Sequence, residues 1–365
     1  MNQNFELSSI LLKTICPNNE FVEDKFGKPS VMVYIPKFKM NQVIGAGSDK
    51  VHPAFIVGGA EKDGFYVSKY QNTDASGVAY SLPAAVPCND VGIVDALEKS
   101  ESKGQGWHLT TVQEWGAIAL WCKKNSHLPY GNNDNGKDRR EDMFKAIPAG
   151  NAISGAGPVL TGTGPLSWSH DGTSAGIWDL NGNLSEWVGG IRMVFGEIQV
   201  IPDNDAALDD ISHDADSTAW RAICSETGRY IVPDGDGNTK GSVKLDFIDE
   251  PFFGWSSKWV VSSNVKNRAN TLRRCDFSFI ACDESIGTEA KELLIALGLI
   301  ADDPLYDYKE QYVYSNNGAA EVFMYRGGFW GSGAFAGVFC WSCSNDREHR
   351  YEGNGFRASY IPNLL

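Results

Sequence analysis

The sequence predicts an α+β fold that is rich in loops. The chain of 365 residues is 42% hydrophobic and 21% charged, which is typical of a globular rather than a disordered protein. It contains 39 glycines and 11 tryptophans, and glycine at about 11% exceeds the usual share of about 7%. Many irregular turns around aromatic anchors are therefore expected, and a helical bundle is excluded.

The N-terminal part is expected to contain two strands and a helix. Residues 1–30 are weakly periodic and are interpreted as an N-terminal arm or small extension. Residues 31–40 are rich in β-forming side chains and contain Pro36, which predicts an edge strand, and residues 64–69 predict a second strand. Residues 91–102 predict a helix.

A clearer helix signal follows Trp107. Thr111 and Glu114 have the Thr-x-x-Glu spacing of a capping box, in which each side chain satisfies a backbone N–H at the start of a helix. An apolar stripe at helical spacing follows and is expected to face the core. It consists of Trp115, Ile118, Ala119 and Cys122.

The rest of the chain changes character several times. Residues 129–176 are dense in glycine and asparagine and predict turns. Residues 177–192 read as strand–turn–strand around an Asn-Gly-Asn turn. Residues 194–320 are less patterned, although 288–297 predict a helix, and residues 322–360 are glycine-rich, aromatic-rich and strand-like.

Charge and composition exclude several classes of function. The chain has 46 acidic and 32 basic residues, so its net charge is −14, and we expect neither a nucleic-acid partner nor docking on anionic lipid. No stretch approaches the roughly 18 uninterrupted apolar residues of a membrane span, and no signal peptide is recognised. The 8 cysteines are too sparse for a secreted disulfide framework.

The metal-binding and redox patterns in the chain are incomplete. Residues 234–238 begin like a Ca²⁺ loop, but Thr239 and Leu245 occupy the positions that need Gly and Glu, so a polar turn is the better interpretation. Cys340 and Cys343 form a lone C-x-x-C without a second pair of zinc ligands. The 6 histidines are scattered. We expect no metal and no cofactor.

Several segments together resemble the formylglycine-generating-enzyme family, which has a C-type-lectin-like fold. They read GFYVSKY at 64–70, WHLTTVQEW at 107–115, GIWDLNGNLSEW at 176–187, RGGFW at 326–330 and GFR at 355–357. The resemblance covers residues 31–365 and is weakest in an insert at 194–320. It implies one loop-rich domain with short antiparallel strands and about two core helices. Some relatives bind Ca²⁺ near this Glu-Trp signature, but hydrogen bonding of the loop by Asn183 and Glu186 is the preferred interpretation.

Within that fold, the segments 107–124, 164–170 and 331–339 resemble the variable proteins of diversity-generating retroelements. In such proteins an error-prone reverse transcriptase rewrites the last segment by randomising template adenines, here about residues 326–357. The resemblance implies a binding surface made of ten variable positions. They are Phe329, Gly331, Ser332, Phe335, Cys340, Ser342, Ser344, Asp346, His349 and Tyr351.

The residue types at these positions agree with adenine mutagenesis of Asn codons, because all ten belong to the set that it can reach. The unreachable types between them are expected to be scaffold: Trp330, Trp341, Glu348 and Glu352. Trp330 and Trp187 are both expected to pack in the core. Cys343, Asn345 and Asn354 are reachable and stay ambiguous. The mixture of aromatic rings with small polar residues is typical of an antibody paratope. Core packing of the rings is the alternative interpretation.

These features predict a non-catalytic protein that recognises a protein or glycan target on a cell surface. We expect it in a phage tail or on a bacterial surface, and it could form a homo-oligomer. The first alternative is an enzyme like those of the resembled family. The resemblance to that family places its two copper-binding cysteines at positions 332 and 337, where this chain has Ser332 and Gly337. Copper chemistry of that kind needs thiolates. The second alternative is a structural component of a virion or cell surface whose C-terminal segment is fixed.

Overall fold

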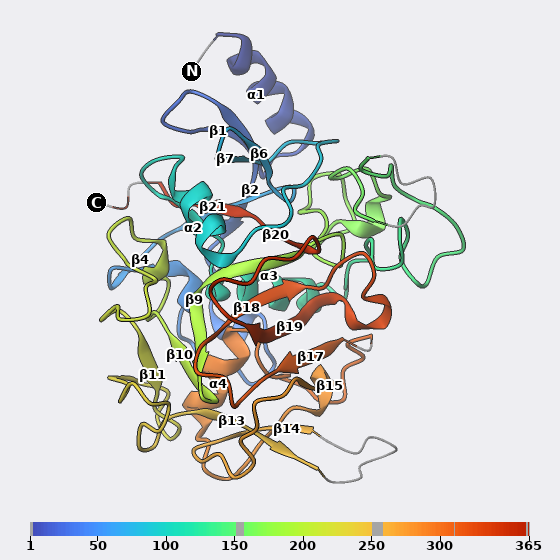
Figure 1. Ribbon diagram of the computed structural model, residues 1–365. Coiled ribbons are helices and arrows are strands. Elements are labelled where there is room, and N and C mark those ends of the chain that lie inside the picture. The colour runs from blue at the N-terminus through green and yellow to red at the C-terminus, as the bar shows by residue number, and fades with distance from the viewer. Residues whose placement is uncertain (1–2, 151–156, 250–257, 310, 363, 365) are drawn as a thin grey trace.

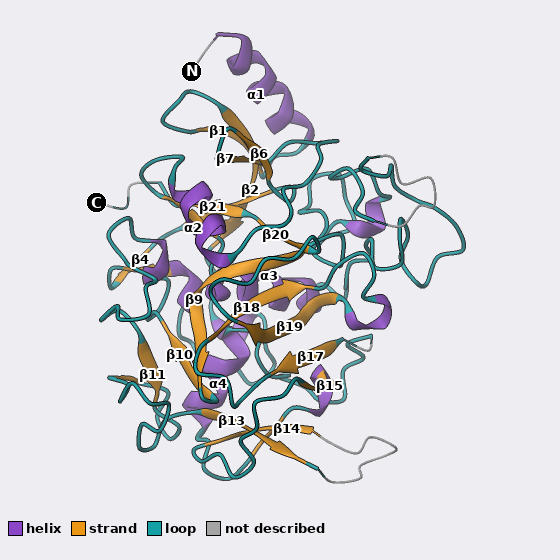
Figure 2. Cartoon of the chain, viewed as in Figure 1, coloured by secondary structure: helices purple, strands orange, loops and turns teal. Residues whose placement is uncertain are grey.

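The chain folds as α+β, as predicted, and most of its regular structure is sheet (Figure 1). The computed structural model describes residues 3–150, 157–249, 258–309, 311–362 and 364. Parts of the predicted 129–176 loops and of the 194–320 insert therefore lie outside the described residues. Four α-helices occur among the residues described: α1 (Gln3–Ile15), α2 (Ile93–Glu101), α3 (Val112–Lys124) and α4 (Thr288–Ala296). Long loops connect these elements, as Figure 2 shows.

A smaller sheet contains the strands at the two ends of the chain. Its order is β1 (Asn19–Glu23), β2 (Pro29–Pro36), β5 (Gly64–Ser68), β21 (Ala358–Tyr360) and β8 (Trp107–Leu109). The prediction of an edge strand at 31–40 is wrong, because β2 pairs on both sides. Pro36 is tolerated because it is the last residue of β2. The outer neighbour, β1, belongs to residues 1–30, for which the sequence predicts an arm or small extension.

A larger sheet runs through the middle of the molecule. On one side of β9 (Ser185–Val194) lie four strands in the order β18 (Val322–Gly327), β19 (Gly337–Asn345), β17 (Tyr312–Ser315) and β15 (Arg273–Asp276). On its other side lie β10 (Glu197–Val200), β13 (Lys244–Ile248), β14 (Lys258–Ser262) and β16 (Ala281–Cys282). The 194–320 insert thus supplies strands at both ends of this sheet.

Shorter strands attach to this sheet or form hairpins. They are β11 (Arg221–Ile223) and β12 (Tyr230–Ile231) beside β10, β20 (Asn354–Phe356) beside β9, and the pairs β3 (Ile56–Val57) with β4 (Ala60–Glu61) and β6 (Thr73–Ala75) with β7 (Val78–Tyr80). Two expectations about the strands need correction. The strands β9 and β19 are 10 and 9 residues long rather than short. Some pairs are parallel, including β17 with β19 and β20 with β9.

The helix α3 confirms the predicted capping box and core stripe. Thr111 Oγ1 accepts from the Glu114 backbone N–H at 3.1 Å, and Glu114 Oε2 accepts from the Thr111 N–H at 3.1 Å. All four residues of the stripe are buried. At Gly116 the helix meets α4 so closely that an added Cβ would lie 2.0 Å from the carbonyl oxygen of Ala296. Only glycine fits this contact without displacing backbone.

The 177–192 segment is only partly as predicted. Its second half forms β9, but its first half forms no strand and makes one isolated bridge, between Ser169 and Trp178. The carboxylate of Glu186 in this segment accepts two hydrogen bonds from the buried guanidinium of Arg357, with N–O distances of 2.5 and 2.6 Å. Asn183 donates from Nδ2 to Gln71 Oε1 at 2.9 Å. Asn183 and Glu186 thus hold chain segments together by hydrogen bonds, in agreement with the preferred interpretation.

Candidate binding site

Side chains from four neighbouring strands, β19 among them, form one row across a face of the larger sheet. The register pairs Ser342 of β19 with Tyr314 of β17 on one side and with Tyr325 of β18 on the other. Tyr314 in turn pairs with Arg274 of β15. Because side chains that are opposite in register point to the same face of a sheet, these residues form one continuous row. The insert therefore contributes part of the surface on which the C-terminal strand displays its side chains.

A cavity of about 300 Å³ lies on this face. Seven of the ten predicted variable positions line it: Phe329, Gly331, Ser332, Phe335, Cys340, Ser342 and Tyr351. The other described residues that line it are Ser185, Leu272, Tyr314, Tyr325, Gly328 and Asn354. None of these lining residues carries a formal charge. Burial raises the pKa of the Cys340 thiol to about 12 and raises the pKa of Tyr325, so these groups stay neutral near neutral pH.

Aromatic rings form two walls of the cavity. Phe329 and Tyr351 meet edge to face with centroids 5.6 Å apart. Phe335 packs edge-on against Tyr312 at 4.3 Å, and the guanidinium of Arg274 lies 5.1 Å from the Phe335 ring. Tyr351 is 39% exposed, and the two phenylalanines are half-buried. The rings are therefore partly open to solvent and are not packed in the core.

The opposite face of β19 is anchored in the core. Trp341 is buried and its Nε1 donates to the carbonyl oxygen of Leu299 at 3.2 Å. Trp115 of α3 donates to the carbonyl oxygen of Val338 at 2.7 Å. Cys343 lies with Trp341 against Met324 and Leu245, on the face opposite Cys340. The C-x-x-C sulfurs thus point to opposite faces of one strand, which rules out their binding one metal ion or forming a disulfide as they stand.

The three remaining predicted positions lie outside the cavity. Ser344 is half-buried, and its hydroxyl lies 2.9 Å from that of Ser342. Asp346 is exposed and His349 is half-buried, both in the loop between β19 and β20. This loop is fixed to the body by Arg347, which donates to the carbonyl oxygen of His213 at 2.9 Å. Arg350 adds an ion pair with Asp95 of α2.

The residues expected to be scaffold differ in their surroundings. Trp341 is in the core, whereas Trp330 is half-buried beside Phe329, and Glu348 and Glu352 are exposed. The expectation of core packing is therefore wrong for Trp330. Of the ambiguous positions, Cys343 faces the core and Asn354 lines the cavity, while Asn345 donates from Nδ2 to the Tyr325 hydroxyl at 3.3 Å.

Several residues that line the cavity were not predicted from the sequence. Leu272 and Tyr314 come from the insert, and Tyr325 immediately precedes the Arg-Gly-Gly segment. The alternation Tyr312-Val313-Tyr314 was a signal for a strand with one aromatic face. Its parallel pairing with β19 could not be read from local pattern, because the partners are far apart in the chain.

The two positions that the resemblance assigns to copper-binding cysteines have other roles. Ser332 Oγ accepts from the backbone N–H of Phe329 at 3.0 Å and so closes the turn after β18. Gly337 has a φ of 150°, and a Cβ added there would lie 2.3 Å from the Gln311 side chain. A cysteine at 337 would need Gln311 to move. Neither position carries a thiol, and a side chain at 337 would clash with Gln311, so the structure gives no support for thiolate chemistry at this pair of positions.

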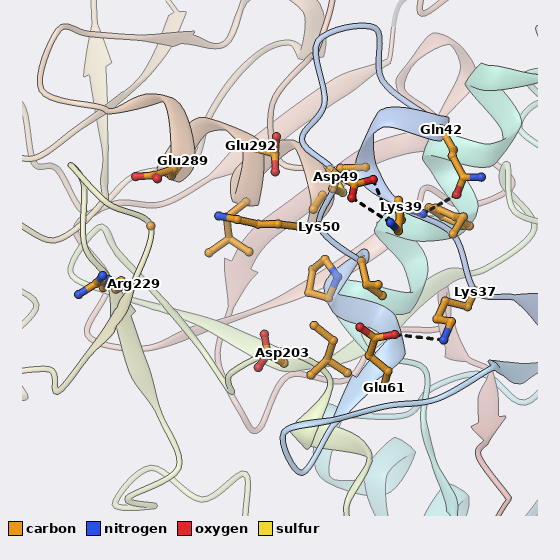
Figure 3. Close-up of a pocket in the computed structure, with 18 of the residues that line it drawn as sticks. Lys37, Lys39, Gln42, Asp49, Lys50, Glu61, Asp203, Arg229, Glu289 and Glu292 are labelled. Carbon is orange, nitrogen blue, oxygen red and sulfur yellow. Dashed lines mark hydrogen bonds and ion pairs between the residues drawn. The ribbon is translucent and has the colours of Figure 1, made fainter.

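A second, larger cavity of about 1010 Å³ lies between the segment after β2, the helix α4 and the 227–230 turn (Figure 3). Both acidic and basic side chains line it, and several of them form ion pairs. Lys37 pairs with Glu61 at 3.1 Å, and Lys39 pairs with Asp49 at 2.9 Å. None of the ten predicted variable positions lines this cavity.

The described residues contain neither a candidate metal site nor a helix that could span a membrane. No group of three or more His, Cys, Asp or Glu side chains comes together there as a metal site would require. No helix in the same residues is long and apolar enough to cross a bilayer.

Comparison with known proteins gives only weak likenesses. No protein-family model and no curated protein matches the chain. The solved "Structure of PvdO from Pseudomonas aeruginosa" is 13% identical, with a TM-score of 0.36, over 91% of this chain and 94% of that one. The "Major Tropism Determinant P3c Variant" is 11% identical, with a TM-score of 0.29, over 90% of this chain and 62% of that one. Both TM-scores are low, so neither likeness indicates a function for this chain.

Proposed function

We propose that this chain is a non-catalytic recognition protein with a C-type-lectin-like fold, whose binding surface is the cavity face of β19 and the adjoining loops. One observation carries the proposal. Seven positions chosen from the sequence as variable line a single cavity, while Trp341 and Cys343, which alternate with them along β19, point into the core. A surface that tolerates substitution needs this separation between displayed side chains and the residues that hold the backbone.

The proposed target is a protein or glycan on a cell surface, and the proposed location is a phage tail or a bacterial surface. Rigid rings supply contact area, and small hydroxyl residues supply adaptable hydrogen bonds, as in antibody paratopes. The proposed source of variation is adenine-directed rewriting of residues 326–357. An enzymatic role is disfavoured because Ser332 and Gly337 stand where thiolates would be needed.

A pair of display libraries tests the proposal. The first randomises the ten predicted variable positions, and the matched control randomises the ten labelled residues of the cavity in Figure 3. Both are selected against the same panel of purified bacterial surface proteins. We expect folded, displayed members in both libraries but specific binders mainly from the first. Equal yields of binders from the two libraries, or loss of display in the first, would contradict the proposal.

A further inference from the structure

The cavity contains a buried amide that lacks a hydrogen-bond partner. Asn354 is 2% exposed and lines the cavity, yet its Nδ2 makes no hydrogen bond within the described structure. The backbone N–H of the same residue is satisfied by the carbonyl oxygen of Tyr351 at 2.9 Å. A buried donor without a partner costs about 1–3 kcal/mol. The position of this amide therefore points to a ligand atom that accepts a hydrogen bond.

Three other polar side chains of the cavity already have hydrogen-bond partners. Ser342 bonds to Ser344, Ser332 bonds to the backbone of Phe329, and Tyr325 accepts from Asn345. A sugar ring presents several hydroxyls and needs several free polar partners. This cavity instead offers mainly rings, a leucine and a thiol beside the Asn354 amide, and none of its described lining residues is charged.

From these contacts we infer that the cavity seats one uncharged aromatic side chain of a protein target, with a phenolic oxygen that accepts from Asn354 Nδ2. The inference rests on the proposed function and narrows its target to protein. The volume of about 300 Å³ is at the lower end of the range of about 300–1,000 Å³ for ligand pockets, which suits a single side chain. The edge-to-face pairs Phe329–Tyr351 and Tyr312–Phe335 leave ring surfaces against which a further ring can pack.

Part of this specificity comes from residues outside the variable set. Tyr314 and Leu272 belong to the insert, and Tyr325 belongs to β18. These residues stay the same when the ten positions change. The preference for an aromatic group is therefore expected to persist among variants, while the surrounding variable side chains select its context.

Small probes test the inference on the full chain. Ligand-observed NMR compares p-cresol, toluene and methyl glucopyranoside. We expect p-cresol to bind with a dissociation constant on the order of 1 mM and about tenfold more tightly than toluene, because only p-cresol has an oxygen that pairs with the free amide. Asn354→Leu should abolish the preference for p-cresol but keep toluene binding. Asn316→Leu, at a position outside the cavity, should change neither.

A second variant guards against misfolding at position 354. Ser342→Phe should fill the cavity and abolish binding of both aromatic probes. Equal binding of p-cresol and toluene to the unmodified chain, or no binding of either, would overturn the inference. Cavity-dependent binding of the glucoside alone would overturn it in favour of a glycan. These outcomes leave the library comparison unaffected, so this inference can fail while the proposed function stands.

Discussion

Trp187 and Trp330 have the same side chain in different surroundings. Trp187 is completely buried, and its Nε1 donates to the carbonyl oxygen of Val91 at 2.8 Å. Trp330 is half-buried and packs edge-on against Phe329. The sequence predicts that both pack in the core, because the local sequence pattern does not distinguish a fully buried tryptophan from a half-buried one. Burial distinguishes them.

The two tryptophans should therefore differ in their effect on stability. Trp187→Ala is expected to lower the free energy of unfolding by about 3–5 kcal/mol, through the lost ring and the cavity that it leaves. Trp330→Ala should cost about 1–2 kcal/mol, because less apolar surface is buried. Urea denaturation of both variants measures this difference. Equal losses would show that the burial assigned to one of them is wrong.

His52 should make stability depend on pH. Its Nδ1 accepts from the Ala54 N–H at 3.1 Å and its Nε2 lies 3.0 Å from the Ala296 carbonyl oxygen, so the buried ring is neutral. Burial lowers its pKa from 6.5 to about 3. In that interval the unfolded chain binds the extra proton, so the free energy of unfolding falls as pH falls, by up to about 1.4 kcal/mol per pH unit.

The variant His52→Gln removes this group from the titration. Its free energy of unfolding, measured by urea denaturation between about pH 7 and about pH 5, should fall less steeply with falling pH than that of the natural chain. His170 and His213, whose pKa values burial also lowers to about 4, keep part of the slope. Identical slopes in the two proteins would mean that His52 is protonated or exposed in the folded state.

The aromatic rings of the cavity should matter for binding more than for folding. Alanine at Phe329, Phe335 or Tyr351 is expected to weaken binding by about 1–3 kcal/mol, if the target is one selected with the natural chain. Tyr351, which is 39% exposed, should show the smallest change in thermal midpoint. Calorimetry gives the thermal midpoint of each variant, and a binding assay on the same samples gives its affinity for the target. A large drop in midpoint with unchanged affinity would place the rings in the core instead.

At the scale of the element, β19 combines two roles by alternation. Phe339, Trp341 and Cys343 are buried in the core, whereas Cys340 and Ser342 line the cavity. A strand is suited to this arrangement because successive side chains point to opposite faces. Substitution on one face can therefore leave the other face unchanged.

The alternation predicts unequal effects at adjacent positions. Trp341→Ala should lower the free energy of unfolding by about 3–5 kcal/mol, since it removes a buried ring and its bond to Leu299. Ser342→Ala should cost about 1 kcal/mol or less, because it loses mainly the hydroxyl contact with Ser344. Paired urea denaturation curves test this. Comparable losses at both positions would contradict the two-faced description of β19.

Local sequence signals predicted some elements well and others poorly. The capping box of Thr111 and Glu114 predicted the start of α3, because capping depends on residues within one turn. The strand expected in the first half of 177–192 is absent, since its peptide groups bond to distant loops instead. The position of β2 inside its sheet was also missed, because it depends on pairing with residues 19–23.

At the scale of the whole molecule, the sheet joins segments that are far apart in the chain. The α+β class followed from composition and periodicity, and seven of the predicted variable positions share one cavity. The contribution of Leu272 and Tyr314 to the cavity could not be predicted, because it requires the register β15–β17–β19. The insert thus completes the candidate binding surface as well as the sheet.

We propose that natural variation in this chain is concentrated on the cavity face of β19. Sequencing the DNA around the 3′ end of the gene is the decisive test. We predict a nearby partial copy of the segment that encodes residues 326–357, differing from it only at adenines, together with a reverse-transcriptase gene. The differences should fall on cavity positions such as Phe335 and Ser342 and spare Trp341. A gene with neither the copy nor the polymerase, and with sibling sequences identical across these positions, would contradict the claim.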